Sequence, residues 1–171
     1  MNKMNEFIKK LNTSRPEEWE QIPDIDLYMD QVIGYMTRQH IGLELDDEET
    51  LTSAMINNYI KSGLLPRAKG KKYNREHIGY LTAICLLKQV LSVGQAGVLL
   101  ENQMEQRDIK DFYQHYKETL DVEFEKTAKL LEGHESDEEL SQMALQLAIS
   151  SYAQKLACQK ILQSLTEEDD V

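Results

Sequence analysis

The chain has 171 residues, of which 41% are hydrophobic and 29% charged, a composition ordinary for one globular domain. Its 30 acidic and 19 basic residues give a formal net charge of -11. No apolar run approaches the roughly 20 residues that a membrane-spanning helix needs, and residues 1–10 lack the pattern of a secretory signal. We therefore expect a cytoplasmic protein in which Cys85 and Cys158 are free thiols.

The first half of the chain predicts three helices and a basic hairpin. Residues 5–12 form a short helix, and Trp19 and Ile22 anchor the rest of this N-terminal arm. Apolar residues at steps of three and four predict a helix over 24–40, followed by an acidic loop over 44–49. A helix over 52–62 ends at Gly63. Residues 66–73 have the length of a hairpin, with Gly70 at the tip, and predict a small two-stranded β wing.

The second half predicts four helices. Asn74 and Ser92 are helix caps and begin helices that extend to about residues 90 and 104. Two long helices follow, over 109–131 and from Ser136 to about residue 165. The last helix is apolar on two adjacent faces, which is more than one neighbouring helix can cover. The surplus face predicts homodimerisation.

The charge pattern changes sign between residues 61 and 75, where there are six cations and no Asp or Glu. The rest of the chain carries -17 once these six are set apart from the total of -11. A local cationic surface on an acidic protein favours one binding place for a polyanion. A solvated loop is the alternative interpretation of such a charge run.

Helix 52–62 and the hairpin together have the composition of a double-stranded DNA-binding surface. Asn can bind adenine through two hydrogen bonds, Ser and Thr bind bases or phosphates, and Lys and Arg bind phosphates. The candidate residues are Thr52, Ser53, Met55, Asn57, Asn58, Tyr59, Lys61, Arg67, Lys69, Lys71, Lys72, Tyr73 and Arg75. Asn57 and Asn58 could equally be ordinary polar residues on an exposed helix face.

Residues 55–67, which read MINNYIKSGLLPR, resemble the signature of MerR-type winged helices. In that family a recognition helix ending in Arg-Tyr-Tyr-Glu precedes Gly-Leu-Leu, Pro and Arg, and then a wing. Tyr59 matches the second aromatic residue, and Arg67 and Lys71 match cations of the wing. Asn57 stands in place of the family's phosphate-binding Arg, Asn58 in place of its first aromatic residue, and Ile60 in place of its acid. Residues 73–78 and 81–100 resemble the wing exit and the following helix pair.

Over residues 15–105 the chain is more similar to a little-characterised group of bacterial YkrK-like proteins. Trp19 and the runs PDIDLYMDQ, at 23–31, and MINNY, at 55–59, carry this resemblance. The group was first catalogued as a domain of unknown function and includes a proposed transcriptional repressor. The resemblance implies transcriptional regulation and supplies no ligand.

The pattern of reactive residues does not predict an enzyme. There is no Gly-rich phosphate loop and no nucleophile beside a local base motif. His40, His77, His115 and His134 have no metal-ligand spacing with either cysteine. We expect no catalytic residue, no metal site and no cofactor.

The sequence thus predicts an all-α protein with a small two-stranded β wing. Residues 1–23 are an arm, 24–105 a winged helix-turn-helix domain, and 106–171 a C-terminal helix pair for dimerisation or sensing. The predicted function is sequence-specific regulation of transcription, most simply as a repressor. Two alternatives remain open at this point: a protein-interaction adaptor that binds an acidic partner, and a regulator whose small-molecule effector lies near Phe112, Tyr116 and Tyr152.

Overall fold

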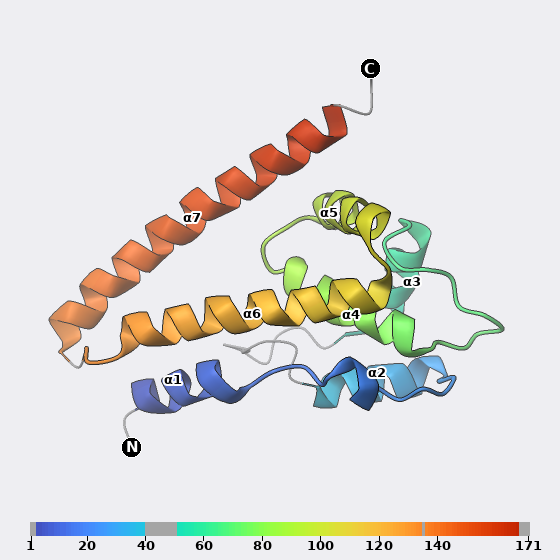
Figure 1. The fold of residues 1–171 in the computed structure, drawn as a ribbon, viewed down its shortest axis with the longest axis horizontal. Helices are drawn as coiled ribbons and strands as arrows, with labels where there is room; N and C mark the ends of the chain where they lie inside the picture. The colour runs from blue at the N-terminus through green and yellow to red at the C-terminus, as the bar shows by residue number, and fades with distance from the viewer. Residues whose placement is uncertain (1–2, 40–50, 135, 168–171) are drawn as a thin grey trace.

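The computed structural model describes residues 3–39, 51–134 and 136–167 and is built from α-helices (Figure 1). They are α1 (Lys3–Thr13), α2 (Met29–Arg38), α3 (Ser53–Lys61), α4 (Arg75–Leu87), α5 (Val93–Gln106), α6 (Ile109–Leu131) and α7 (Asp137–Glu167), with a short 3-10 turn, η1 (Trp19–Gln21). The predicted all-α class is confirmed. In the described residues β pairing is limited to two isolated bridges, Leu27–Tyr73 and Lys69–Lys72, so the predicted two-stranded wing is not shown there.

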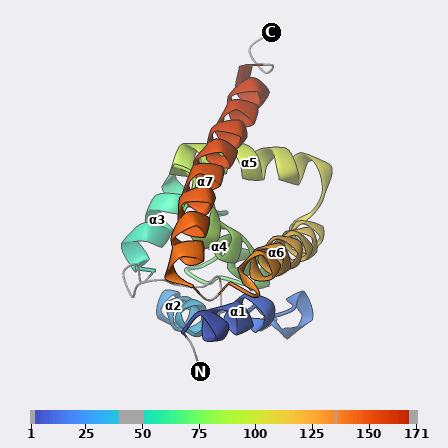
Figure 2. The ribbon, with the colours of Figure 1, turned by 90° about the vertical axis from the view of Figure 1, so that its left-hand side faces the viewer.

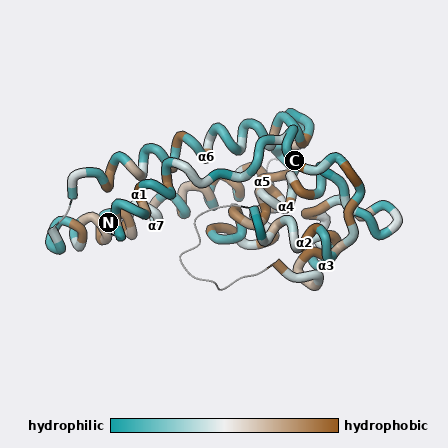
Figure 3. Tube along the Cα trace, turned by 90° about the horizontal axis from the view of Figure 1, so that it is seen from below, coloured by the Kyte–Doolittle hydropathy of each residue, from teal (hydrophilic) through white to brown (hydrophobic). Residues whose placement is uncertain are grey.

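Helix α4 is the centre of the main core. Its residues from His77 to Ile84, Tyr80 apart, are all buried, because α2 and α6 pack on it. At Gly79 an added Cβ would lie 2.9 Å from a ring carbon of Trp19, so this glycine lets the indole lie directly against the helix. Figure 3 shows hydrophobic residues gathered where α2, α3, α4 and α5 meet.

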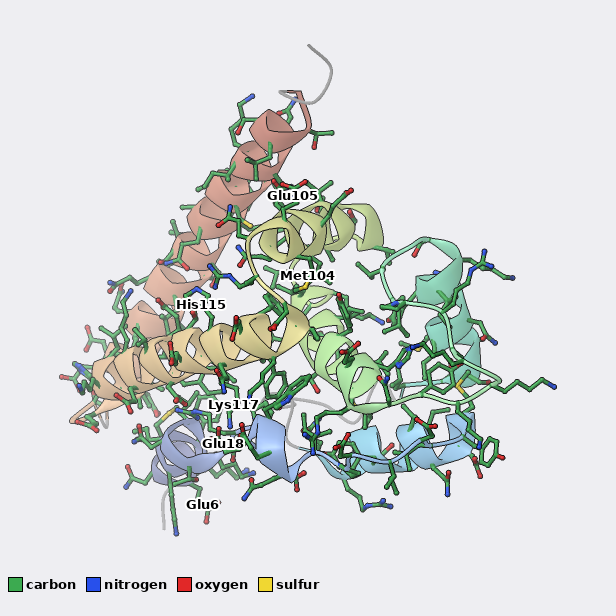
Figure 4. All side chains as sticks on the ribbon, turned by 45° about the vertical axis from the view of Figure 1, so that its right-hand side comes forward. Glu6, Glu18, Met104, Glu105, His115 and Lys117 are labelled. Carbon is green, nitrogen blue, oxygen red and sulfur yellow. The ribbon has the colours of Figure 1, made fainter. Side chains whose placement is uncertain are left out.

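A polar strap joins the segment before η1 to α6. The hydroxyl of Tyr113 donates to the carbonyl of Glu17 at 2.6 Å, and the ammonium of Lys117 lies 2.6 Å from a carboxylate oxygen of Glu18 (Figure 4). Arg15 pairs with Asp121 one turn further along the same helix. Burial raises the pKa of Tyr113, which keeps its phenol protonated as a donor. The predicted N-terminal arm is therefore fixed to the C-terminal half of the chain.

Helix α7 lies on the outside of the fold and contacts it towards its two ends (Figures 1 and 2). Met143 and Leu147 pack on a small cluster of α1 and α6, and Leu162 is buried in the main core. An open groove lies between α1, α6 and the first half of α7. No helix in the described ranges is both long and apolar enough to span a membrane.

The predicted helices are all found, with one marked shift. The helix expected over 24–40 begins instead at Met29, because Leu27 is held in extended conformation by its backbone pairing with Tyr73. The acidic loop predicted over 44–49 lies outside the described residues. The core draws on Trp19, Leu81, Phe112 and Leu162, so all three predicted segments contribute to it, and the boundaries at 23 and 105 stay predictions.

Candidate nucleic-acid interface

Helix α3 presents one polar face to solvent. Ala54, Asn57, Asn58 and Lys61 are exposed and follow the three- and four-residue spacing of a single helix face. Ile56 and Tyr59, on the opposite side, are buried in the core, with Met55 partly buried beside them. The helix is thus fixed by its apolar side, and its two asparagines and one lysine face outwards.

Local hydrogen bonds define the two ends of α3. The Thr52 hydroxyl accepts from the Met55 N–H at 3.2 Å, as an N-cap residue does. At the other end Gly63 has φ +77°, and the N–H groups of Leu64 and Leu65 both donate to the Tyr59 carbonyl. This left-handed glycine ends the helix and sends the chain into the basic segment.

The basic segment is a two-residue hairpin turn. Lys69 and Lys72 exchange backbone hydrogen bonds of 3.1 Å, and the two residues between them, Gly70 and Lys71, have φ +57° and +63°. Positive φ at both central positions is the geometry of a type I′ turn. The loop extends away from the helices at the right of Figure 1, and Figure 3 shows the same edge as hydrophilic.

Two contacts hold the base of this hairpin. Leu27 and Tyr73 pair through backbone hydrogen bonds of 2.7 and 2.8 Å. The buried imidazole of His77, in the first turn of α4, donates from Nε2 to the Arg67 carbonyl at 3.2 Å, and its Nδ1 lies 3.1 Å from the Asn74 backbone nitrogen. One ring therefore links the beginning of the hairpin to its end.

The cations of this surface are not neutralised by acids that the structure describes. Lys61, Arg67, Lys69 and Lys71 are exposed, and within the described ranges none forms an ion pair. Lys72 lies over the exposed ring of Tyr28, with its ammonium 5.6 Å from the ring centre. The whole stretch over 51–75 contains no Asp or Glu. The surface can therefore attract a polyanion.

For three of the predicted contact residues, the position in the structure does not fit the predicted role of contacting a ligand. Tyr59 is 2% exposed and Tyr73 is 4% exposed, so both are core residues and their rings cannot touch a ligand on this surface. The Arg75 guanidinium donates from Nε to the Ile22 carbonyl at 3.0 Å and stacks over Trp19, so it fixes the N-terminal segment. Of the remaining set, Met55 is partly buried, and Thr52, Ser53, Asn57, Asn58, Lys61, Arg67, Lys69, Lys71 and Lys72 are exposed.

Sequence reasoning missed three residues that shape this surface. Tyr28 falls within the helix predicted over 24–40, but it precedes α2 and is exposed beside Lys72. Leu27 and His77 hold the hairpin through contacts with residues distant in the sequence, which no local pattern signals.

The predicted effector site does not come together. Phe112 and Tyr116 pack in the main core with ring centres 6.3 Å apart, whereas Tyr152 is exposed on the outer side of α7. Across the described ranges, no group of three His, Cys, Asp or Glu residues could hold a metal ion.

Comparison with known proteins places most of the chain in a family. The model of a family described as "Domain of unknown function (DUF1836)" matches residues 17–118, more than half of the chain. This range includes η1, the interface and the helices α2 to α5, and it excludes α1 and α7. No curated protein and no solved structure matches the chain.

Proposed function

The chain belongs to the DUF1836 family, whose description assigns no activity, and from the geometry of the interface we propose that it is a DNA-binding regulator of transcription. Helix α3 enters the major groove, and its exposed Asn57 and Asn58 read base edges. The turn at 69–72 acts as a wing whose lysines bind the flanking phosphates. A repressor that blocks a promoter is the simplest form of this activity.

The single observation that supports the proposal is the combination of an outward polar helix face with an adjoining acid-free cationic hairpin. A helix face with two asparagines and no acid is suited to bases, and a flexible array of lysines is suited to phosphates. The remaining charge of -17 repels DNA from the rest of the molecule and so favours one orientation of binding. Dimerisation through the C-terminal helices would let two such surfaces bind two half-sites.

The proposal is tested by selecting bound sequences from random duplex DNA and measuring the affinity for the best sequence at several salt concentrations. Each lysine–phosphate contact contributes a log–log slope of roughly -0.9. Lys69→Gln with Lys72→Gln should make the slope shallower by up to about 1.8 if both lysines contact phosphate. Lys9→Gln with Lys10→Gln, two exposed lysines of α1, is the matched control and should leave the slope unchanged.

Asn57→Ala and Asn58→Ala should instead change which sequences are selected, with a smaller effect on the salt slope. If no duplex is enriched over competitor DNA, the proposal is wrong. If the two hairpin substitutions abolish binding of an acidic peptide while duplex DNA is never retained, the adaptor function replaces it.

A further inference from the structure

The outer face of α7 carries a stripe of large apolar side chains with no covering element among the described residues. Leu145, Ile149, Tyr152 and Leu156 are 57%, 62%, 65% and 47% exposed. They follow steps of four, three and four residues, so they form a continuous seam of the kind that pairs two helices. The opposite side of the same helix already packs on α1, α5 and α6 through Met143, Leu147 and Leu162. The stripe is therefore a separate, unused surface.

The spacing of the apolar residues in the stripe is the same when it is read in either direction along the helix. The 4-3-4 spacing has its centre between Ser150 and Ser151, so reversing the direction of the helix places each apolar residue opposite another one. In an antiparallel pair Leu145 meets Leu156 of the second copy, and Ile149 meets Tyr152. Such a self-complementary patch is what a two-fold interface requires, since one surface has to match itself.

The charges on α7 select the same arrangement. From residue 140 to 154 the helix has no charged side chain, and its N-terminal turn holds Asp137, Glu138 and Glu139. Lys155 directly precedes Leu156, the last residue of the stripe, and Lys160 follows it. In this antiparallel register Lys160 of the second copy lies opposite Ser141, within one helical turn of Glu139. A parallel pair would place three acids against the same three acids, which is unfavourable.

We infer that the stripe on α7 binds the same stripe on a second copy of this chain, antiparallel, with the two-fold axis passing between Ser150 and Ser151. This inference specifies the partner and register of the proposed homodimer. Its use in binding two half-sites rests on the proposed function, but the pairing itself does not depend on DNA.

The first experiment is sedimentation equilibrium of the full chain without DNA. The unaltered chain should sediment at twice its mass of 19.8 kDa. Ile149→Glu, in the centre of the seam, should dissociate it to the monomer. Ile161→Glu is the matched control, because Ile161 is 60% exposed on the same helix but off the stripe; it should leave the dimer intact. A monomeric parent chain, or equal effects of the two substitutions, would overturn the inference.

The second experiment determines the orientation by disulfide trapping in a Cys85→Ser, Cys158→Ser background, with circular dichroism as the check on folding. Leu145→Cys protein mixed with Leu156→Cys protein should give a cross-linked dimer. Either protein alone should not, because two copies of one position lie about 16 Å apart along an antiparallel pair, beyond the reach of a disulfide. Cross-linking of each protein alone would show a parallel pair and refute the proposed register. Because neither experiment contains DNA, its outcome is distinct from that of the DNA-binding test.

Discussion

Lys71 is the one non-glycine residue with positive φ in the described part of the chain, at +63°. A side chain in this region costs roughly 1–2 kcal/mol, and strained positions of this kind cluster at functional sites. The residue occupies the tip of the turn at 69–72, and its side chain is exposed to solvent. The conformation is thus unfavourable for folding and suitable for binding a phosphate.

Lys71→Gly should separate these two effects. Glycine adopts positive φ without a steric penalty, so the free energy of unfolding should rise by about 1 kcal/mol. The affinity for DNA should fall at the same time, because one cation is removed. Urea unfolding and fluorescence anisotropy measure the two quantities, and Lys71→Arg is the control that keeps both strain and charge. A loss of stability in the glycine variant would contradict this account of the turn.

Tyr116 has a buried hydroxyl group that is unfavourable for stability. Its hydroxyl is sealed from solvent and has no hydrogen-bond partner among the described residues. Burial raises the pKa of this phenol, and the neighbouring Tyr113 adds to the shift. Above pH 10 the phenol therefore ionises in the unfolded chain and stays neutral in the folded one, so stability falls as the pH rises from 10 towards the folded pKa.

Tyr116→Phe should therefore raise the free energy of unfolding by about 1 kcal/mol at neutral pH, since an unsatisfied buried hydroxyl is lost. It should also make the alkaline loss of stability shallower. Denaturation by urea at pH 7 and at several values above 10 tests both points. Tyr152→Phe, at an exposed ring, is the control. An unchanged alkaline profile in the Tyr116 variant would show that this phenol does not contribute to it.

At the scale of elements, the hairpin depends on its neighbours more than on its own sequence. A single pair of backbone bonds closes it, and its base is held by the Leu27–Tyr73 bridge and by the ring of His77. Periodicity and caps predicted all seven helices, because those signals lie within a few residues. They did not predict the late start of α2 or the exposure of Tyr28, because these depend on pairing between residues 27 and 73.

His77→Phe should loosen the hairpin while α4 stays folded. The aromatic ring can still pack against Tyr73, but the contacts with Arg67 and Asn74 are lost. The backbone amides of Lys69 and Lys72 should exchange with solvent faster, as followed by NMR, and DNA binding should weaken. His77→Gln should restore part of the protection, because glutamine at this helix position can bond back to the cap residue. Equal exchange in all three proteins would exclude a positioning role.

For the molecule as a whole, the strap between the N-terminal segment and α6 makes distant parts of the chain interdependent. The sequence predicted the exposed helix face and the cationic turn, since both follow from local patterns. It did not show that Tyr59 and Tyr73 are in the core or that Arg75 is bound to Ile22, since these facts depend on packing between distant segments. Lys117 was also not singled out, although it is 7% exposed and paired with Glu18.

The ion pair of Lys117 and Glu18 predicts that substitutions of its two partners lower the free energy of unfolding by different amounts. Glu18→Ala leaves a nearly buried ammonium without its partner and should lower the free energy of unfolding by about 2–3 kcal/mol. Lys117→Met removes the ammonium and keeps the apolar stem, while Glu18 remains mostly exposed to water, so its cost should be about 1 kcal/mol or less. Urea denaturation gives both values. Glu20→Ala, on the exposed Lys110–Glu20 pair, is the control and should change little. Equal losses at Glu18 and Lys117 would contradict the expected asymmetry.

The backbone bridge between Leu27 and Tyr73 has a practical consequence for spectroscopy. Binding of a ligand to the lysines at 69–72 should disturb the backbone at Tyr73 and, through the bridge, the peptide groups just before α2, which are far from the turn in the sequence. The nuclear resonances of these two amides should thus report on occupancy of the tip without a label placed there, and they would let binding be followed in the unmodified chain.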